Sequence, residues 1–337
     1  MVKRRRSIPE ELADIGRKIS RVFFCFYMPL VAVLVLLHYP YDTDQSIYPM
    51  PSVEAKTDAS RIAVAPVRTR SGDFYEAVYS GPDKNGLQKR QGLNYEETAL
   101  AAAAKANVRE HVAYFVDKYD IKNKSVLEVG SGQGSLQDLV DDYTGLDISA
   151  AAASKYHKKF VVASATAMPF PDNSFDAIWT VWVVEHIPEP ERAMREMRRV
   201  LKPGGKLFLY VAWNCTSWLA DGFSVRPYSD FNWKGKMVKA SLSARDTGYF
   251  KAAHQLPTRL IRWAQYGWNG RTEPLRFRAL EPNYTTYWQA DSDAAIGLDP
   301  FEALLWHRAQ GDVCLNCTSM LNALGNPESA WILEIRK

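Results

Sequence analysis

Cysteine is scarce in this sequence, which has only 4 cysteines in 337 residues. That number is too small for the disulfide framework of a small secreted domain. Cys314 and Cys317 form a C-x-x-C pair, but a second pair of ligands at the spacing of a zinc site is missing. Half of a zinc site, a redox pair and a disulfide stay open as alternatives. Two ordinary thiols are the preferred interpretation, and no metal is expected.

The sequence also has little excess charge of either sign: its formal net charge is +4. Much of the basic excess lies at the extreme N-terminus, and no continuous basic stripe of the kind that neutralises phosphates follows it. A nucleic-acid partner is therefore not expected. With 47% apolar and 24% charged side chains, the composition is that of a globular protein. The length of 337 residues allows one domain with a full hydrophobic core and some additional segments.

Charged residues are absent from residues 22–41, an apolar run of 20 residues. Because a helix of about that length crosses the hydrocarbon layer, the run predicts a single transmembrane anchor. A secretory signal is the alternative, but no A-x-A-like site follows closely. Basic residues precede the run at Lys3, Arg4, Arg5, Arg6, Arg17, Lys18 and Arg21. This bias places residues 1–21 in the cytoplasm. The side of the membrane that holds residues 42–337 stays open, because Pro29 could kink the segment so that both of its ends lie on the same side.

Composition and periodicity divide the remainder of the chain. Residues 42–94 are expected to be a stem and lead-in, because their first part is rich in Pro, Ser, Asp and Thr without sustained periodicity. Apolar residues at helical spacing predict one amphipathic helix from Glu97 to Asp120. The domain core is expected at residues 95–213, followed by an insertion at 214–326 and a closing strand at 327–337.

From Ser125 onward, apolar strands alternate with short helices. The strands are expected at residues 125–130, 143–149, 160–164, 175–183 and 206–213. Such alternation indicates an α/β fold with a doubly wound, mostly parallel sheet covered on both faces. Pro190 begins the last of these helices, and the Pro-Gly-Gly sequence at 203–205 is expected to end it. The final strand is expected to pair antiparallel with one near Val313.

Glycines follow the first strand directly, at Gly130, Gly132 and Gly134, where a backbone without Cβ atoms can approach a ligand. Asp147 ends the second strand, and its carboxylate can accept hydrogen bonds from both ribose hydroxyls. Together they predict a nucleoside cofactor at the carboxyl edge of the sheet. The G-S-G-Q-G spacing is not that of a dinucleotide loop, and Asp147 comes early, 13 residues after Gly134. Glu128 is expected to help orient an amino group, directly or through water.

The same stretch resembles the class I S-adenosylmethionine-dependent methyltransferases, specifically the type 11-like small-molecule group typified by ubiquinone and menaquinone biosynthesis enzymes. The resemblance covers residues 125–213. Its matching segments, in the family's order, are VLEVGSGQG, GLDIS, FVVASATAMPFPDNSFDAIWTVWVVEHI and MREMRRVLKPGGKLFL. The resemblance implies a Rossmann-like methyltransferase fold, S-adenosylmethionine as the cofactor and methyl transfer as the activity.

The resemblance also assigns residues to parts of the cofactor. Those expected to line the methionine portion are Gly130, Ser131, Gly132 and Gly134. Asp147 and Ile148 would hold the ribose and adenine. The chain departs from the family at Ser164, followed by Ala165, where the family usually places an aspartate against the adenine amino group. Because a hydroxyl accepts that hydrogen bond without charge assistance, weaker cofactor affinity or a backbone substitute is expected.

Methyl transfer of this kind needs few side chains, because the main task is to hold the acceptor in line with the methyl carbon at roughly 3 Å. His186, with Glu185 beside it, follows the fourth strand at the carboxyl edge of the sheet. His186 is a candidate base for a hydroxyl acceptor. A structural or orienting role is the alternative.

The insertion is rich in aromatic residues, which suggests where acceptor specificity lies. They are Trp218, Tyr228, Trp233, Trp263, Trp268, Tyr284, Tyr287 and Trp288. An apolar wall for a lipid, quinone or phenolic acceptor is one interpretation. The preferred one is the core of an added helical subdomain.

Three acidic residues of the insertion, Asp291, Asp293 and Asp299, lack the full spacing of a calcium loop. Asp299 directly precedes Pro300 and is expected to cap a helix instead.

The sequence as a whole predicts a membrane-anchored methyltransferase that acts on a small-molecule or lipid-like acceptor. A non-catalytic membrane module that keeps the fold is the alternative, with Ser164 as a sign of decay, but the intact glycines and Asp147 argue against it. A dehydrogenase-like nucleotide binder is disfavoured by the glycine spacing.

Overall fold

The computed structural model describes residues 70–80, 95–212, 215–245, 247–268, 274–284, 289–317, 319–325 and 330–337. The predicted basic tail, the anchor at residues 22–41 and most of the stem lie outside the described residues. Within the described ranges, none of the helices combines the length and apolar character that a membrane span requires.

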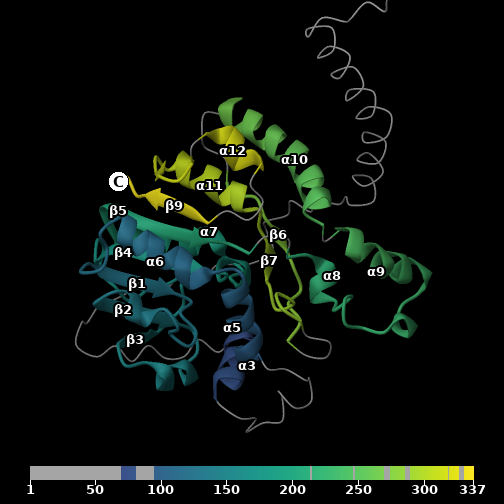
Figure 1. Ribbon diagram of the computed structural model, residues 1–337, viewed down its shortest axis with the longest axis horizontal. Helices are drawn as coiled ribbons and strands as arrows, with labels where there is room; N and C mark the ends of the chain where they lie inside the picture. The colour runs from purple at the N-terminus through teal and green to yellow at the C-terminus, as the bar shows by residue number, and fades with distance from the viewer. Residues whose placement is uncertain are drawn as a thin grey trace, which may run out of the picture. The chain divides into compact units, whose positions relative to one another are not determined.

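The described part of the chain forms a seven-stranded sheet in the order β3-β2-β1-β4-β5-β9-β8 (Figure 1). The strands are β1 Ser125–Val129, β2 Asp142–Asp147, β3 Lys159–Val162, β4 Phe175–Val181, β5 Leu201–Tyr210, β8 Val313–Cys314 and β9 Trp331–Glu334. The first five run parallel, and β9 runs antiparallel to both β5 and β8. The predicted doubly wound sheet and its antiparallel closing strand are therefore confirmed.

The strand order reverses between β1 and β4. From β1 the chain moves to β2 and β3 on one side, and then to β4 and β5 on the other. In open α/β sheets, ligands bind at such a switch point, beyond the carboxyl ends of the strands. The loops that follow β1 and β4 are consequently the first place to look for a site.

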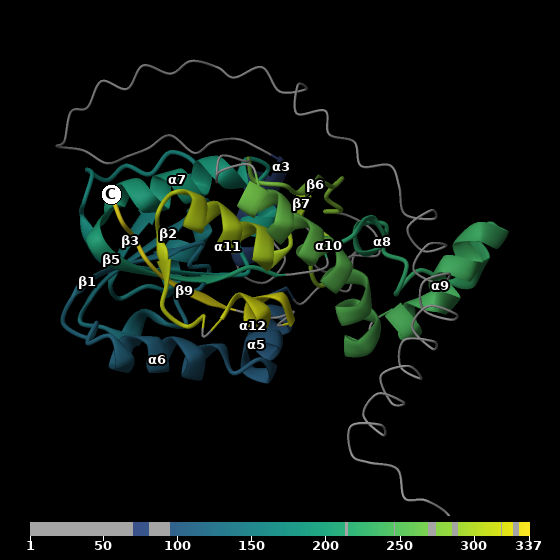
Figure 2. The ribbon, with the colours of Figure 1, turned by 90° about the horizontal axis from the view of Figure 1, so that it is seen from above.

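Alternate side chains of β5 pack into opposite layers, as the two-residue period of a strand requires. Leu207 and Leu209 pack in the same core as residues of α7 (Pro190–Val200) and α11 (Pro300–Ala309). Phe208 packs on the other face with residues of α6 (Val108–Lys118). Figure 2 shows α6 on one side of the sheet and α7 with α11 on the other. The core is thus a sheet between two layers of helices.

Two sequence predictions fail at helix ends. The single helix expected from Glu97 to Asp120 is two helices, α5 (Tyr95–Lys105) and α6, separated at Asn107, whose φ is 50°. Asn tolerates this left-handed conformation better than most residues, so the chain can turn where the apolar periodicity continues. Helix α7 ends at Val200, before the Pro-Gly-Gly sequence, which lies within β5.

The insertion contributes α8 (Ser217–Ala220), α9 (Trp233–Arg245), α10 (Gly248–Trp268) and the short pair β6 (Arg278–Ala279) and β7 (Ile296–Gly297). Its aromatic residues do not form the expected core. Trp233 and Trp268 are 68% and 91% exposed. The reason is that α9 buries no residue and therefore provides no partner layer. Tyr287 and Trp288 lie outside the described residues.

Two predictions about the C-terminal part have opposite outcomes. The carboxylate of Asp299 accepts a hydrogen bond from the backbone N–H of Phe301 at 2.8 Å, so the predicted cap of α11 is confirmed. Cys314 and Cys317 are joined as a disulfide. The preferred interpretation of two ordinary thiols is therefore wrong, because the turn after β8 brings their Cα atoms to 5.5 Å, within the range that a disulfide bridges.

Candidate functional site

The loop after β1 has a conformation that favours glycine. Gly130 and Gly134 both have a φ of 69°, and Gly132 has a φ of 49°. A Cβ atom on Gly130 would lie 2.3 Å from Cγ2 of Val183, and one on Gly134 would lie 2.7 Å from the ring of Tyr156. Both distances are too short for real atoms, so the loop requires glycine for its backbone angles and for its close neighbours.

Asp147 is buried at the carboxyl end of β2 and is tied to the glycine loop. Its Oδ2 accepts a hydrogen bond from the N–H of Gly132 at 2.8 Å, and its Oδ1 accepts one from the N–H of Ser149 at 3.0 Å. Burial raises the pKa of Asp147, although these backbone bonds oppose the shift. Each carboxylate oxygen has a second lone pair, so the fixed side chain can still accept hydrogen bonds from two ligand hydroxyls.

Glu128 lies on β1, just before the loop, and is also buried. The hydroxyl of Tyr143 on β2 donates a hydrogen bond to its Oε2 at 2.5 Å. Burial raises the pKa of Glu128 to about 7, although the bond from Tyr143 opposes the shift. Ser131 is buried next in the loop, and its backbone N–H donates to the carbonyl of Leu146 at 3.0 Å.

Helix α3 (Arg70–Tyr79) covers this loop, and the sequence prediction missed it. Glu76 accepts hydrogen bonds from the hydroxyl of Ser149 at 2.8 Å and from the N–H of Ala151 at 3.1 Å. The hydroxyl of Tyr79 lies 3.0 Å from the place that a Cβ on Gly132 would take. Ile148 packs against the aromatic cluster of this helix, which also contains Phe74, Tyr75 and Val78. Phe74, Tyr75 and Val78 have the spacing of one helical face, which was the available signal.

Ser164 follows β3 and has its hydroxyl turned toward its own loop. Its Oγ accepts a hydrogen bond from the N–H of Thr166 at 3.2 Å and lies 2.8 Å from Oγ1 of the same residue. The N–H of Ala163 donates to the carbonyl of Asp147 at 2.9 Å, which holds this loop beside the carboxyl end of β2. Ala165 is half-buried against the core. An adenine amino group would therefore share the Ser164 hydroxyl with Thr166.

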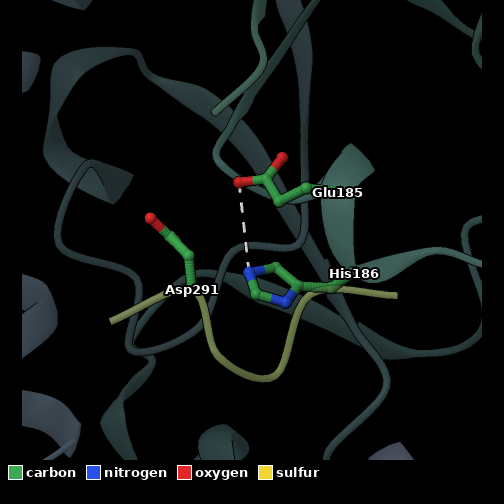
Figure 3. A group of neighbouring side chains, drawn as sticks. All are labelled: Glu185, His186 and Asp291. Atoms are coloured by element: carbon green, nitrogen blue, oxygen red, sulfur yellow. Dashed lines mark ion pairs between the residues drawn. The ribbon is translucent and has the colours of Figure 1, made fainter. Parts of the chain in front are cut away.

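A second group of polar side chains lies after β4. The 3-10 turn η5 (Val184–His186) presents Glu185, which is fully buried, and His186, whose side chain is 15% exposed. Figure 3 shows both residues with Asp291, which comes from the loop before β7. Nε2 of His186 lies 4.0 Å from Oε1 of Glu185, and Nδ1 lies 3.3 Å from the backbone oxygen and 3.5 Å from Oδ2 of Asp293.

The charges of this group act on one another. Burial raises the pKa of Glu185 to about 7, although His186 opposes the shift. Burial also raises the pKa of Asp291. For His186, burial acts to lower the pKa, but Asp293, Glu185 and Asp291 outweigh it, so the pKa is raised. The carboxylates of Glu185, Asp291 and Asp293 therefore stabilise a positive charge at this place, either on the imidazolium of His186 or on another cation.

The sequence singled out Asp291, Asp293 and Asp299 together, and the structure separates them. Asp291 and Asp293 join His186, whereas Asp299 caps α11. The sequence had no signal for this grouping, because Asp293 is 107 residues from His186 along the chain. The hydroxyl of Tyr75 on α3 donates to Oδ2 of Asp293 at 2.7 Å, so α3 contacts both polar groups.

A parallel sheet with a glycine loop after β1 and a buried acid at the end of β2 defines a nucleoside-binding protein of the doubly wound α/β class. Residues 127–209 match the family model described as a methyltransferase domain. The predicted resemblance to class I methyltransferases, which use S-adenosylmethionine, is thereby confirmed for this segment.

Curated relatives also match over the same part of the chain. The demethylmenaquinone methyltransferase of Renibacterium salmoninarum is 39% identical over 26% of this chain and 40% of its own length. The sterol 24-C-methyltransferase of Gibberella zeae is 32% identical over 36% of each chain. The ubiquinone/menaquinone biosynthesis C-methyltransferase of Hahella chejuensis is 31% identical over 38% of this chain and 44% of its own length. The chain thus spans less than half the length of these relatives.

Among solved structures, an amino pentose methyltransferase from Micromonospora echinaspora is 20% identical to this chain, with a TM-score of 0.29. The match covers 32% of this chain and 50% of that one.

Proposed function

We propose that this chain is a membrane-anchored enzyme that transfers the methyl group of S-adenosylmethionine to a small-molecule or lipid-like acceptor. The observation that carries the proposal is the bond between Asp147 and the N–H of Gly132, because it joins the acid expected on the ribose to the loop expected on the methionine portion. Gly130, Gly132 and Gly134 would bear the methionine portion, and Asp147 with Ile148 the ribose and adenine.

Bound S-adenosylmethionine would supply an electrophilic methyl group on a sulfonium leaving group. The chain's own part is to hold an acceptor atom in line with that methyl group and to exclude water. Helix α3 supports this role, since Tyr79 faces Gly132 of the glycine loop and Tyr75 bonds Asp293 in the group around His186. For a hydroxyl acceptor, Nε2 of His186 would take the proton while Asp293 holds Nδ1.

A membrane location suits an apolar acceptor. The candidate anchor at residues 22–41 supports it, and so does the surface of the insertion. Exposed apolar side chains there are Leu256, Leu260, Ile261, Trp263 and Trp268 on α10, and α9 carries Lys234, Lys236 and Lys239. Apolar and basic side chains on neighbouring helices are typical of protein surfaces that lie on a bilayer.

The basic tail would lie in the cytoplasm by the charge bias. The Cys314–Cys317 disulfide favours the opposite side of the membrane for the domain, because disulfides persist in oxidising compartments. Asn123 is exposed and begins an Asn-Lys-Ser glycosylation sequence. In a eukaryotic host, a glycan on Asn123 that is lost in Asn123→Gln would support that side. An unmodified Asn123 would argue for the cytoplasmic side.

The function is tested by calorimetric titration of the full chain, purified in detergent, with S-adenosylhomocysteine. The wild type and Asp142→Ala are expected to bind, because Asp142 is an exposed residue of the same strand that pairs with Lys159. Asp147→Ala is expected to lose binding. A folded wild-type chain that binds neither S-adenosylhomocysteine nor NAD would identify the non-catalytic module instead, and binding of NAD alone would identify a dehydrogenase-like protein.

The role of His186 needs a separate measurement. Transfer of a labelled methyl group to membrane extracts should fall far more in His186→Gln than binding of S-adenosylhomocysteine does. Equal losses in both would remove His186 from the chemistry.

A further inference from the structure

The group around His186 contains a buried hydrogen-bond acceptor that no donor of the described residues reaches. Oε1 of Glu185 is fully buried and has no hydrogen-bond partner within the described residues. It faces Nε2 of His186 at 4.0 Å, which is too long for a hydrogen bond. A buried carboxylate oxygen without a partner is costly, so this position calls for a ligand.

Asp293 determines which nitrogen of His186 is available. Nδ1 lies 3.3 Å from the backbone oxygen of Asp293 and 3.5 Å from its Oδ2, so Nδ1 is the nitrogen placed to carry the proton. When a cation displaces the proton of Nε2, the lone pair of Nε2 faces Glu185 and is free to coordinate the cation. Asp293 is itself held by the hydroxyl of Tyr75 at 2.7 Å. Histidines that bind a metal through one nitrogen usually donate the N–H of the other nitrogen to a carboxylate or a backbone carbonyl, as His186 does here.

Asp291 completes the arrangement. One ligand atom each from Glu185, His186 and Asp291 lie within 4.8 Å of one another, and Figure 3 shows the three side chains gathered around one space. Two ligands of one ion with bonds of about 2.1 Å are at most about 4.2 Å apart, so a small side-chain movement would close the set. Within the described part of the chain, Glu185 and Asp293 form ion pairs with His186 and with no lysine or arginine.

We propose that Glu185, His186 and Asp291 bind a divalent cation, with Asp293 and Tyr75 orienting the histidine. One imidazole and two carboxylates suit Mn²⁺ or Zn²⁺ better than a soft cation, which prefers thiolates, or Ca²⁺, which prefers oxygen ligands alone. A protonated amine would meet the same acceptors and could donate a hydrogen bond to Nε2, so amine binding is the competing outcome of the test.

The consequence for catalysis rests on the proposed function. The cation would lie next to the cofactor loop, because Val183, three residues before His186, contacts Gly130. Helix α3 makes a second link, since Tyr75 bonds Asp293 and Tyr79 faces Gly132. With the cation bound, Nε2 of His186 is a ligand and no longer the base. The cation would instead bind an acceptor oxygen and lower its pKa, so that the proton leaves to water, which favours an acceptor with a hydroxyl or enol group.

The test is cation binding by the full chain after treatment with a chelator. Mn²⁺ is followed by electron paramagnetic resonance, and Zn²⁺ by equilibrium dialysis with elemental analysis. The wild type is expected to bind a single ion, and Asp291→Asn to bind it at least about tenfold more weakly. Asp291 has a φ of 63°, which asparagine also adopts, so this variant keeps the fold. Tyr75→Phe is expected to weaken binding by about tenfold through the histidine.

The matched control is His157→Gln, which removes the exposed histidine paired with Asp138 at 2.8 Å. This variant should bind the ion like the wild type. Asp147→Ala should lose S-adenosylhomocysteine but keep the ion, so the two proposals fail separately. A folded wild-type chain that binds S-adenosylhomocysteine but neither Mn²⁺ nor Zn²⁺ at millimolar concentration overturns the inference. So does ion binding that Asp291→Asn leaves unchanged. Thermal stabilisation by a primary amine without ion binding would assign the group to a cationic acceptor.

Discussion

The guanidinium of Arg259 on α10 forms a bidentate pair with the carboxylate of Asp299: Nε donates to Oδ2 at 2.9 Å and Nη2 donates to Oδ1 at 2.7 Å. Arg259 is only 2% exposed, and its Nη1 also donates to the backbone oxygen of Leu324 on α12 (Met320–Gly325) at 3.0 Å. Because Asp299 caps α11, this one side chain connects three helices of the chain's second half. The rest of α10 carries the exposed apolar residues, so Arg259 fixes their position relative to the core.

Arg259→Met is expected to lower the free energy of unfolding by about 3 to 5 kcal/mol, since it leaves the partly buried Asp299 without its partner. Adding Asp299→Asn should recover part of the loss, because asparagine keeps the cap and removes the charge. Arg195→Met is the control, since Arg195 is 68% exposed in its pair with Glu191, and its effect should stay within about 1 kcal/mol. Urea denaturation of all four proteins checks this, and equal effects of Arg259→Met and Arg195→Met would contradict it.

The sequence could predict what depends on local periodicity and could not predict what depends on distant contacts. The strand before Gly130 could be predicted because parallel strands buried on both faces are near-continuous apolar runs. The strand that ends at Asp147 could be predicted because it follows in the alternating pattern of strands and short helices. Asp291 and His186 could not be grouped from the sequence, because loops far apart along the chain bring them together. Helix α3 was missed because the surrounding segment looks like a stem, although its residues from Phe74 onward have helical spacing. The break at Asn107 was hidden because the apolar pattern continues across it.

Gly130 and Gly204 provide a comparison between backbone strain and steric collision. Both have a positive φ, 69° and 77°, but a Cβ on Gly204 would meet no heavy atom within 4 Å, whereas one on Gly130 would collide with Val183. Gly204→Ala is therefore expected to cost about 1 to 2 kcal/mol of stability from the backbone alone. Gly130→Ala should cost more and should also weaken binding of S-adenosylhomocysteine. Calorimetry and thermal unfolding check both effects, and equal losses from the two variants would mean that Val183 moves aside.

Ser164→Asp tests the proposed position of the adenine. An aspartate can accept the N–H of Thr166 as the serine does, and it offers a charged acceptor to the adenine amino group. Affinity for S-adenosylhomocysteine is expected to stay the same or to rise by up to about tenfold. Ser174→Asp is the control, because its exposed hydroxyl bonds only its own turn at Pro171 among the described residues. A large loss of affinity in Ser164→Asp alone, measured by calorimetry, would refute the alignment of this loop with the adenine site.

Glu128 should make the stability of the chain depend on pH. Its pKa of about 7 in the folded chain is above the ordinary value of 4.5, so the native state binds more protons than the unfolded state between these two values. The contribution of this group to stability is therefore greatest below pH 4.5 and is lost as pH rises through 7, by about 3 kcal/mol in total.

Glu128→Gln removes this dependence while its amide oxygen still accepts the hydrogen bond from Tyr143. The variant should lose less stability than the wild type between pH 5.5 and 8 in urea denaturation. Part of the slope should stay, because Glu185 also has a pKa raised to about 7. Glu110→Gln, on the exposed face of α6, should keep the full slope. If Glu128→Gln has the same slope as the wild type, the carboxyl of Glu128 does not titrate in this range, and its bond with Tyr143 holds a charged group.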